Sequence, residues 1–364
     1  MAMQEGFRCG MGIGGWLTNY KRILVLPPAR RHILTTGDFE HFQTYITQWD
    51  INNIADMGMD HIRLAFDQVV MENADRPGEY REECLRHLDN AIGWCKSAGL
   101  KVMLNLHKAI GCYCDCPDEN NLLTDEGLWN RFIDFWVMLE KRYAGEGHVA
   151  FELMNEINTY NSEGWNRLAA KTITALQKLN PNRLIVLGSA NFGDPALLKD
   201  LILFDDPHIA YTFHMYSPFE FTHQRGVLQH EPAFYNRQMR YPDSLDRYYD
   251  YRKTLGKAAD DLDGLQRMDI AYMQRMMQPA CDFVRQHPDK ILYFGEFGTI
   301  RHCDIRSREN WMQDVISIAR EASIPYSVWN YLSTPYDGNR FSLVDDETRQ
   351  ILSPRLLQII QGRI

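Results

Sequence analysis

The chain lacks the features that mark several large classes of protein. No stretch approaches the roughly 20 apolar residues that a membrane-spanning helix needs. No block of consecutive Lys or Arg suggests a phosphate-binding surface, and the net charge of −9 also argues against nucleic acid as the main ligand. We therefore expect neither a membrane nor a nucleic acid among its partners.

The chain also lacks low-complexity segments and linkers rich in Pro, Gly or Ser. Because 45% of the residues are hydrophobic and 12% are aromatic, we expect one domain over residues 1–364 with a large core. The N-terminus shows no basic start followed by an apolar run, so we expect no signal peptide in this chain. The location then stays open between the cytoplasm and secretion with the signal removed.

Cysteine is present, but not in the pattern of a disulfide-rich protein. Eight cysteines in 364 residues do not make a disulfide framework. Three of them alternate in Cys112-Tyr113-Cys114-Asp115-Cys116, a spacing that differs from the CxxC pairs of common zinc sites. We expect a loop of free thiols here, with a disulfide inside the loop or a metal site as the alternatives.

Short apolar runs alternate with longer helical patterns along the chain. This alternation indicates βαβ units and a parallel sheet. Eight runs read as strands, which is the number in the α/β fold called the (β/α)8 or TIM barrel. The expected strands are 7–14, 61–65, 101–106, 149–154, 184–187, 209–213, 291–294 and 326–329. The expected helices are 40–57, 82–98, 126–143, 163–179 with Ser162 as its cap, 195–201, 265–286, 308–322 and 354–361.

Residues 218–264, between the sixth strand and its helix, break this rhythm. A loop of that length inside a compact domain is usually a functional lid or a small subdomain. Its place after a strand end puts it beside the face where barrels carry their active sites, so we expect it to narrow the site and add aromatic contacts. Its tyrosines are Tyr235, Tyr241, Tyr248, Tyr249 and Tyr251. The alternative is an insertion that packs only on itself.

Polar or aromatic residues recur where the expected strands end. Glu156 follows the fourth apolar run and Glu296 follows the seventh, which places two carboxylates at the rim of the barrel. The other candidates, after strands two, three, four, six and eight, are Arg63, His107, Asn155, His214, Tyr216 and Trp329. One such residue alone could be a satisfied polar group at the edge of the core. Together they indicate a shared pocket.

This set of residues resembles the family-5 glycoside hydrolases, cellulase-type enzymes of the clan of retaining (β/α)8 glycosidases. The matching pattern runs from the segment 12–16 to Trp329-Asn330, and the run 219–224 with the insertion after it resembles endoglucanases of this family. One departure follows His107. Many relatives carry an Ala-Pro-Gly turn there, whereas this chain has Lys108-Ala109-Ile110-Gly111, which bears on substrate preference.

The resemblance implies that Glu156 is the acid/base and Glu296 the nucleophile of a double displacement, with their carboxyl groups about 5–5.5 Å apart. We expect Arg63 and Tyr216 to hydrogen-bond Glu296, and burial together with the charge of Glu296 to raise the pKa of Glu156. The expected substrate-binding residues are Arg63, His107, Asn155, His214, Tyr216 and Trp329. Asn155 suits the sugar 2-hydroxyl and Trp329 a stacked pyranose. This chemistry needs no metal and no cofactor, and we expect none.

We therefore predict a retaining endo-β-glucanase that hydrolyses β-1,4 bonds in cellulose-like or mixed-linkage β-glucan polysaccharides and oligosaccharides, and that acts as a monomer. A β-mannanase and an exo-β-1,3-glucanase are alternatives on the same scaffold. A non-catalytic carbohydrate-binding barrel is an alternative of another class. Such a protein would usually have lost one of the two carboxylates, and both are present here.

Overall fold

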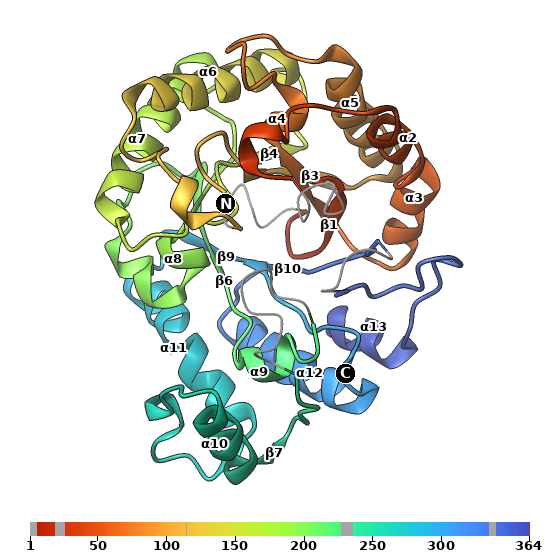
Figure 1. The fold of residues 1–364 in the computed structure, drawn as a ribbon, viewed down its shortest axis with the longest axis vertical. Coiled ribbons are helices and arrows are strands. Elements are labelled where there is room, and N and C mark those ends of the chain that lie inside the picture. The colour runs from red at the N-terminus through yellow and green to blue at the C-terminus, as the bar shows by residue number, and fades with distance from the viewer. Residues whose placement is uncertain (1–5, 19–25, 114, 227–235, 335–339) are drawn as a thin grey trace.

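The computed structural model describes residues 6–18, 26–113, 115–226, 236–334 and 340–364, and its centre is a closed barrel of parallel strands (Figure 1). Around the barrel the strands follow the order β1-β10-β9-β6-β5-β4-β3-β2. They are β1 (Cys9–Leu17), β2 (His61–Asp67), β3 (Lys101–Lys108), β4 (Val149–Glu152), β5 (Ile185–Gly188), β6 (Ile209–His214), β9 (Ile291–Glu296) and β10 (Tyr326–Val328). Each expected strand overlaps one of these, and the (β/α)8 barrel with a subdomain inserted after the sixth strand is confirmed. Cys114 and Tyr235 lie outside the described residues.

Helices surround the barrel, and most of them begin and end near the expected residues. They are α2 (Thr36–Thr44), α3 (Gln48–Asp56), α4 (Gln68–Met71), α5 (Glu82–Ala98), α6 (Glu126–Tyr143), α7 (Ser162–Leu179), α8 (Ala190–Gly193), α9 (Phe219–Thr222), α10 (Leu245–Thr254), α11 (Ile270–Gln286), α12 (Ile305–Glu321) and α13 (Pro354–Ile360). Short 3-10 turns are η1 (Pro28–Arg30), η2 (Pro117–Glu119), η3 (Pro195–Asp200) and η4 (Asp260–Leu262).

Three helix predictions are corrected by side-chain caps. The expected helix 40–57 is two helices, because the backbone N–H and the hydroxyl of Thr47 both donate to Asp50 and start α3 anew. Helix α7 is capped by Asn161 and not by Ser162, since the Asn161 side chain accepts from the N–H of Gly164. Helix α11 begins after Asp269, whose side chain caps it, and not at residue 265.

Alternate side chains of the strands point into the barrel and out towards the helices. On β3, Val102 and Leu104 belong to the main hydrophobic cluster that the helices cover, whereas Met103 belongs to a second, smaller cluster. That smaller cluster combines residues from several barrel strands, which places it in the interior of the barrel. Above it along the strands, the buried interior positions are polar, as with Arg63 on β2 and Glu152 on β4. An apolar layer and a polar layer of side chains thus lie next to each other in the barrel interior.

The inserted segment forms a small subdomain at the lower end of the molecule in Figure 1, where α10 and the two-stranded sheet of β7 (Asp243–Ser244) and β8 (Arg267–Met268) extend beyond the ring of helices. Tyr241, Tyr248 and Tyr251 are buried, so they form its core and do not face a substrate. The Tyr241 hydroxyl donates to Asp314 of α12 at 2.6 Å. The insertion therefore packs against the barrel's own helices as well as on itself.

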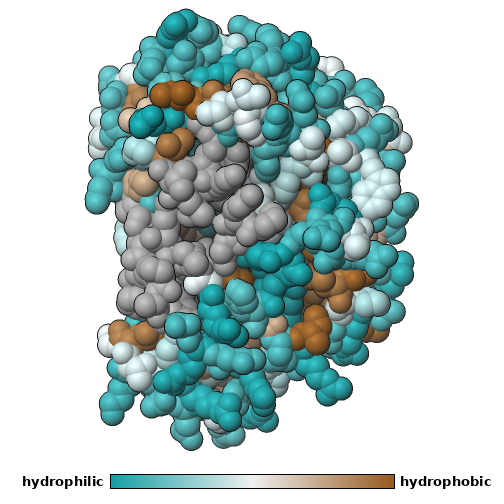
Figure 2. Space-filling view, turned by 45° about the vertical axis from the view of Figure 1, so that its right-hand side comes forward, coloured by the Kyte–Doolittle hydropathy of each residue, from teal (hydrophilic) through white to brown (hydrophobic). Residues whose placement is uncertain are grey.

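The surface shown in Figure 2 is mostly hydrophilic, with hydrophobic residues in small separate groups. Within the described parts of the chain, no helix combines the length and the apolar character that crossing a bilayer requires.

Candidate active site

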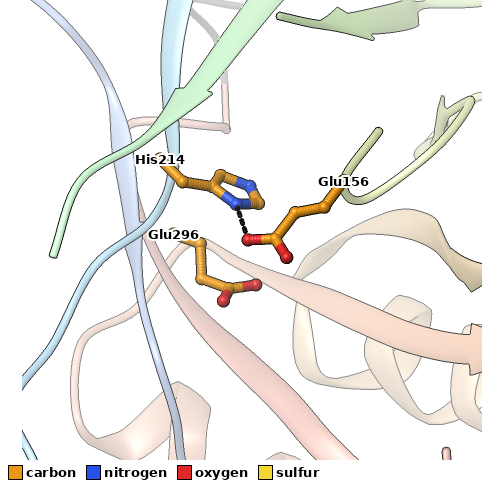
Figure 3. Close-up of side chains that lie close together, drawn as sticks. All are labelled: Glu156, His214 and Glu296. Carbon is orange, nitrogen blue, oxygen red and sulfur yellow. Dashed lines mark hydrogen bonds and ion pairs between the residues drawn. The ribbon is translucent and has the colours of Figure 1, made fainter. Parts of the chain in front are cut away.

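The candidate site lies where the strands end, and strand register brings its central residues together. His214 is the last residue of β6 and Glu296 the last residue of β9, and these two residues are register partners of neighbouring strands. Glu156 lies in the loop that follows β4 and reaches the same point. One potential ligand atom from each of these three side chains lies within 4.8 Å of the others (Figure 3). The site is therefore assembled from three strands that are far apart in sequence.

Arg63 is the buried cation at the centre of the site. Its Nη1 donates to Oε2 of Glu296 at 2.7 Å, as expected from the sequence. Its Nε and Nη2 bind both carboxylate oxygens of Glu152 at 2.6 and 2.7 Å, and Nη2 also donates to Oδ1 of Asn155 at 2.7 Å. Burial alone would lower the pKa of Arg63, but Glu152 and Glu296 outweigh it and the pKa is raised. Arg63 is thus a permanent charge with fixed orientation.

Glu152 was not among the predicted site residues. It is fully buried, and it holds Arg63 in the bidentate geometry that suits a guanidinium. The signal in the sequence is an acid inside the apolar run Ala150-Phe151-Glu152-Leu153. A carboxylate at such a position must be paired when it is buried. We infer that it requires a cation whose side chain reaches the same barrel interior, and Arg63 on β2, one strand beyond β3, supplies it.

Glu296 receives hydrogen bonds on both carboxylate oxygens. Besides Arg63 on Oε2, the hydroxyl of Tyr216 donates to Oε1 at 2.7 Å. Burial, with Glu296 as the next cause, raises the pKa of Tyr216 well above its usual value, so this phenol stays protonated and remains a donor. Two donors fix the orientation of the carboxylate, which suits a nucleophile.

Glu156 has a different environment. Its side chain is 17% exposed, and Oε1 lies 2.9 Å from Nδ1 of His214. Burial raises the pKa of Glu156 to about 7, although Arg63 and Lys108 act in the opposite direction. Among the acidic neighbours, Glu152 adds to the rise. Glu156 can therefore carry a proton near neutral pH.

His214 is neutral at the pH where Glu156 titrates, because burial lowers its pKa to about 4. Nη2 of Arg63 lies 3.3 Å from Nε2 of His214. Since a guanidinium is only a donor, Nε2 acts as the acceptor and Nδ1 carries the ring proton. Nδ1–H then donates to Glu156, which leaves Oε2 of Glu156 as the oxygen that carries the exchangeable proton.

His107, Trp329 and Asn155 also lie at this end of the barrel. The His107 ring stacks on Trp329 with centroids 5.5 Å apart and an interplanar angle of 8°. Trp329 is 7% exposed, and a Cβ added at Gly14 would lie 2.3 Å from its ring, so glycine there lets the indole lie close to β1. Asn155 is buried beside Arg63. Sequence reasoning thus brought together eight residues that the fold places in one region.

The loop after β3 contacts the backbone of Glu156 through the side chain of Cys112. Cys112 is buried, with Sγ 3.9 Å from the carbonyl oxygen of Glu156. Asp115 forms an ion pair with Arg31, and the Arg31 guanidinium lies 5.6 Å from the centroid of the Tyr113 ring. The cysteines that the structure describes are all free thiols. This ion pair ties the loop to the segment that leads from β1 to α2.

Among the described residues, Glu156, His214 and Glu296 form the group of side chains that could hold a metal ion, because one ligand atom from each lies within 4.8 Å of the others. Both oxygens of Glu296 already accept hydrogen bonds from Arg63 and Tyr216. A cation here would have to displace these donors and sit beside a buried guanidinium. The arrangement therefore fits a pair of reacting carboxylates better than a metal site.

Comparison with known proteins gives the family. The profile of the family described as Cellulase (glycosyl hydrolase family 5) matches residues 31–334. Endoglucanase C of Acetivibrio thermocellus is 34% identical over 360 residues, which cover 98% of both chains. Cellodextrinase A of Ruminococcus flavefaciens is 28% identical over 315 residues, covering 85% of this chain and 80% of the relative. This chain belongs to glycosyl hydrolase family 5.

Solved structures show the same fold. A chain described as an endoglucanase superposes with a TM-score of 0.74 at 19% identity, covering 100% of both chains. Thermotoga maritima Cel5A in complex with cellobiose gives a TM-score of 0.72 at 20% identity over 98% of both chains. The same enzyme in complex with mannotriose gives 0.71 at 21% identity, over 98% of this chain and 97% of that one. At these identities the likeness concerns the barrel alone.

Proposed function

We propose that this protein is a retaining endo-β-glucanase that hydrolyses internal β-1,4 bonds of β-glucans by double displacement. One observation carries the proposal. Two carboxylates with oxygens within 4.8 Å of each other have opposite surroundings, since Glu296 accepts from two donors while the pKa of Glu156 is raised to about 7. This spacing fits the retaining arrangement, in which no water stands between the carboxyl groups.

In the first step the Glu296 carboxylate attacks the anomeric carbon, and the bond from that carbon to the glycosidic oxygen breaks. Glu156 gives its proton to the departing oxygen, and the sugar becomes an ester of Glu296. Arg63 and Tyr216 hold the nucleophile so that one oxygen can attack while its orientation is fixed. Asn155 lies next to the acid, where it suits the sugar 2-hydroxyl.

In the second step water replaces the leaving group. Formation of the ester removes the charge of Glu296, which lowers the cost of ionising a carboxyl group close to it. Glu156, now a carboxylate, takes a proton from the water as its oxygen attacks the anomeric carbon. The ester bond breaks and Glu296 leaves as a carboxylate, so both residues return to their starting states.

The substrate class comes from the relatives. The full-length relatives at 34% identity carry the name endoglucanase, and they span 98% of this chain. This supports a β-glucan substrate and cleavage within the chain. His107 and Trp329, stacked on each other beside the site, supply an imidazole and the edge of an indole for contact with the sugar at the cleavage point.

The experiment is a comparison of rates on carboxymethylcellulose, barley β-glucan, xylan and glucomannan, with NMR of the first anomer released. We expect cleavage of both glucans, a rapid fall in viscosity, and a β-anomer as first product. Preferential cleavage of glucomannan would make the protein a mannanase instead. An α-anomer as first product would contradict double displacement.

We further propose that residues 218–264 form a subdomain within the single domain 1–364 and act as a wall of the substrate cleft. Phe219 of α9, 43% exposed, lies after Tyr216 with Ser217 and Pro218 between them. A deletion that keeps Tyr216 should change product lengths more than it changes the midpoint of thermal unfolding. The proposal that the protein acts as a monomer is tested by light scattering on the purified chain.

A further inference from the structure

Tyr216, whose hydroxyl donates to Glu296, lies beyond the end of its barrel strand. Strand β6 ends at His214, and the N–H of Met215 donates to the carbonyl of Glu296 at 3.2 Å. After this bond the chain leaves the sheet and turns into α9. The position of the Tyr216 hydroxyl therefore depends on what holds the backbone of this turn.

Thr222, the last residue of α9, binds that backbone. It is fully buried, and its hydroxyl donates to the carbonyl of Tyr216 at 2.5 Å. The carbonyl of Pro218, one turn back, is a more distant acceptor at 3.4 Å. The carbonyl of Thr222 accepts from the N–H of Ile300 at 2.9 Å, in the loop that follows Glu296. One buried residue thus bonds to both segments that carry the proposed nucleophile and its tyrosine donor.

The ring of Tyr216 packs against the residue that ends the same helix. The rings of Tyr216 and His223 meet edge to face, with centroids 5.2 Å apart and an interplanar angle of 68°. Nδ1 of His223 lies 3.0 Å from Oγ1 of Thr222. Since the Thr222 hydroxyl gives its proton to the Tyr216 carbonyl, Oγ1 accepts from Nδ1–H. The backbone and the ring of Tyr216 are therefore both placed by the end of α9.

Helix α9 has four residues, which is too short to be stable by itself. The inserted subdomain holds it. The buried carboxylate of Glu220 accepts from Nε of Arg252 in α10 at 2.5 Å. Arg252 is also buried and forms a second ion pair with Asp261, which accepts from the hydroxyl of Tyr272 in α11 at 2.7 Å. The buried pair of Glu220 and Arg252 thus joins α9 to α10 and α11.

The two donors on Glu296 are therefore supported in different ways. Arg63 is bound by the carboxylate of Glu152 inside the barrel. Tyr216 is bound by α9, and α9 is held by the subdomain. The hydrogen bond from Tyr216 to Glu296 depends on residues outside the barrel strands.

We propose that Thr222 is a positioning residue for the nucleophile, and that the buried pair of Glu220 and Arg252 holds Thr222 in place. The inference rests on the proposed function, because it uses the role of Glu296. A nucleophile attacks efficiently only when the reacting atoms are held in a narrow range of orientation. By fixing Tyr216, the inserted subdomain acts on the chemical step.

The test is a double-mutant cycle on an aryl β-cellobioside, whose leaving group needs no proton. Thr222→Val removes the hydroxyl but keeps the shape of the side chain and the backbone carbonyl. We expect kcat/KM to fall about tenfold, because the nucleophile is less well oriented in the transition state. In a Tyr216→Phe background the same change should cost less than about twofold, because the hydroxyl that Thr222 positions is gone. Losses that multiply in the double variant would overturn the proposal.

Thr222→Ser separates the hydroxyl from the methyl group. It keeps the donor, so we expect kcat/KM on the aryl cellobioside to stay within about twofold of the parent. A loss as large as that of Thr222→Val would show that packing and not the hydrogen bond to Tyr216 is needed, which would overturn the proposal. If the unaltered protein cleaves neither the aryl cellobioside nor a glucan, it is the proposed function that fails.

Arg252→Met tests the support of α9. It leaves the Glu220 carboxylate buried without this cation, so the midpoint of thermal unfolding and kcat/KM should both fall. The matched control is Arg183→Met. Arg183 forms a buried ion pair with Glu140, and its Nη1 donates to the carbonyl of Val149 where β4 begins, at the end of the barrel away from the site.

The control should lower the unfolding midpoint but keep the parental kcat/KM, with all rates measured well below both midpoints. An unchanged kcat/KM in Arg252→Met would overturn the role of the ion pair. An equal loss of kcat/KM in Arg183→Met would do the same, because lost stability alone would then explain the effect.

Discussion

Replacing Glu156 with glutamine should stabilise the protein above neutral pH while it removes the proposed acid/base. Burial raises the pKa of Glu156 from 4.5 to about 7 in the folded chain. Between these two values the folded state holds a proton that the unfolded state has lost, so stability is present below about pH 4.5 and is lost as pH rises through about 7. At about 1.4 kcal/mol for each pH unit, the loss comes to about 3 kcal/mol.

Glutamine has the shape of the protonated acid and accepts the same hydrogen bond from His214, but it does not titrate. Glu156→Gln should therefore match the parent near pH 4.5 and exceed it by about 3 kcal/mol at pH 8. With an unfolding entropy of about 2.1 cal/mol/K per residue, that corresponds to roughly 4 °C in the unfolding midpoint. The assay is differential scanning calorimetry of both proteins between pH 4.5 and 8.

The matched control is Glu163→Gln, which makes the same chemical change on a side chain that is 84% exposed. Its midpoint should follow the parent at every pH. The reasoning about Glu156 is refuted if the difference between Glu156→Gln and the parent is the same at pH 4.5 and pH 8, or if the variant is the less stable protein at pH 8.

Three further predictions concern activity. Glu296→Gln should lose activity by about 10³-fold or more on every substrate. Glu156→Gln should keep activity on an aryl cellobioside, because the phenolate leaves without a proton. Similar losses of the two variants on this activated substrate would mean that the roles assigned to Glu156 and Glu296 are wrong. Lys108→Met should move the fall of kcat/KM above neutral pH to higher pH, because the Lys108 ammonium lowers the pKa of Glu156; a pH profile with an unmoved or lowered alkaline limb would contradict this. Activity should survive EDTA unchanged, since Arg63 and Tyr216 already occupy both oxygens of Glu296; loss that added zinc restores would show a metal at work.

The strands were predictable because each is a short apolar run bounded by breaks, and a parallel barrel buries both faces of every strand. Helix boundaries were harder to predict from the sequence where a capping side chain sets the first turn. The segment 40–57 reads as one apolar pattern, and only the paired hydrogen bonds of Thr47 and Asp50 divide it. The same applies to α11, where an Asp269 cap selects the first turn.

The site was predictable as a set of residue types at strand ends, but its pairings were not. Arg63 could be expected near Glu296 from the resemblance alone. That its main partner is Glu152 follows from barrel geometry, since β2 and β4 both flank β3 and point these side chains into the same interior layer. The left-handed backbone of Asn191 and Phe192 in α8 could not be predicted from the sequence either. It depends on hydrogen bonds from their N–H groups to the loop after β4, which only the folded structure brings close.

The pairing of Glu152 has a consequence for the pH range of the enzyme. Arg63 binds two carboxylates, those of Glu152 and Glu296. Glu152 is one of the groups that raise the pKa of Glu156. Glu152→Gln keeps an oxygen for Arg63 and removes one charge, so the pKa of Glu156 should fall and the alkaline limb of kcat/KM should move to lower pH. Breaking a buried ion pair costs about 3–5 kcal/mol of folding stability. The pH profile of Glu152→Gln is therefore measured at a temperature well below the unfolding midpoint of this variant. Lys108→Met and Glu152→Gln should thus shift the same limb in opposite directions. If Glu152→Gln instead moves it to higher pH, the charge balance around Arg63 does not set the proton affinity of Glu156.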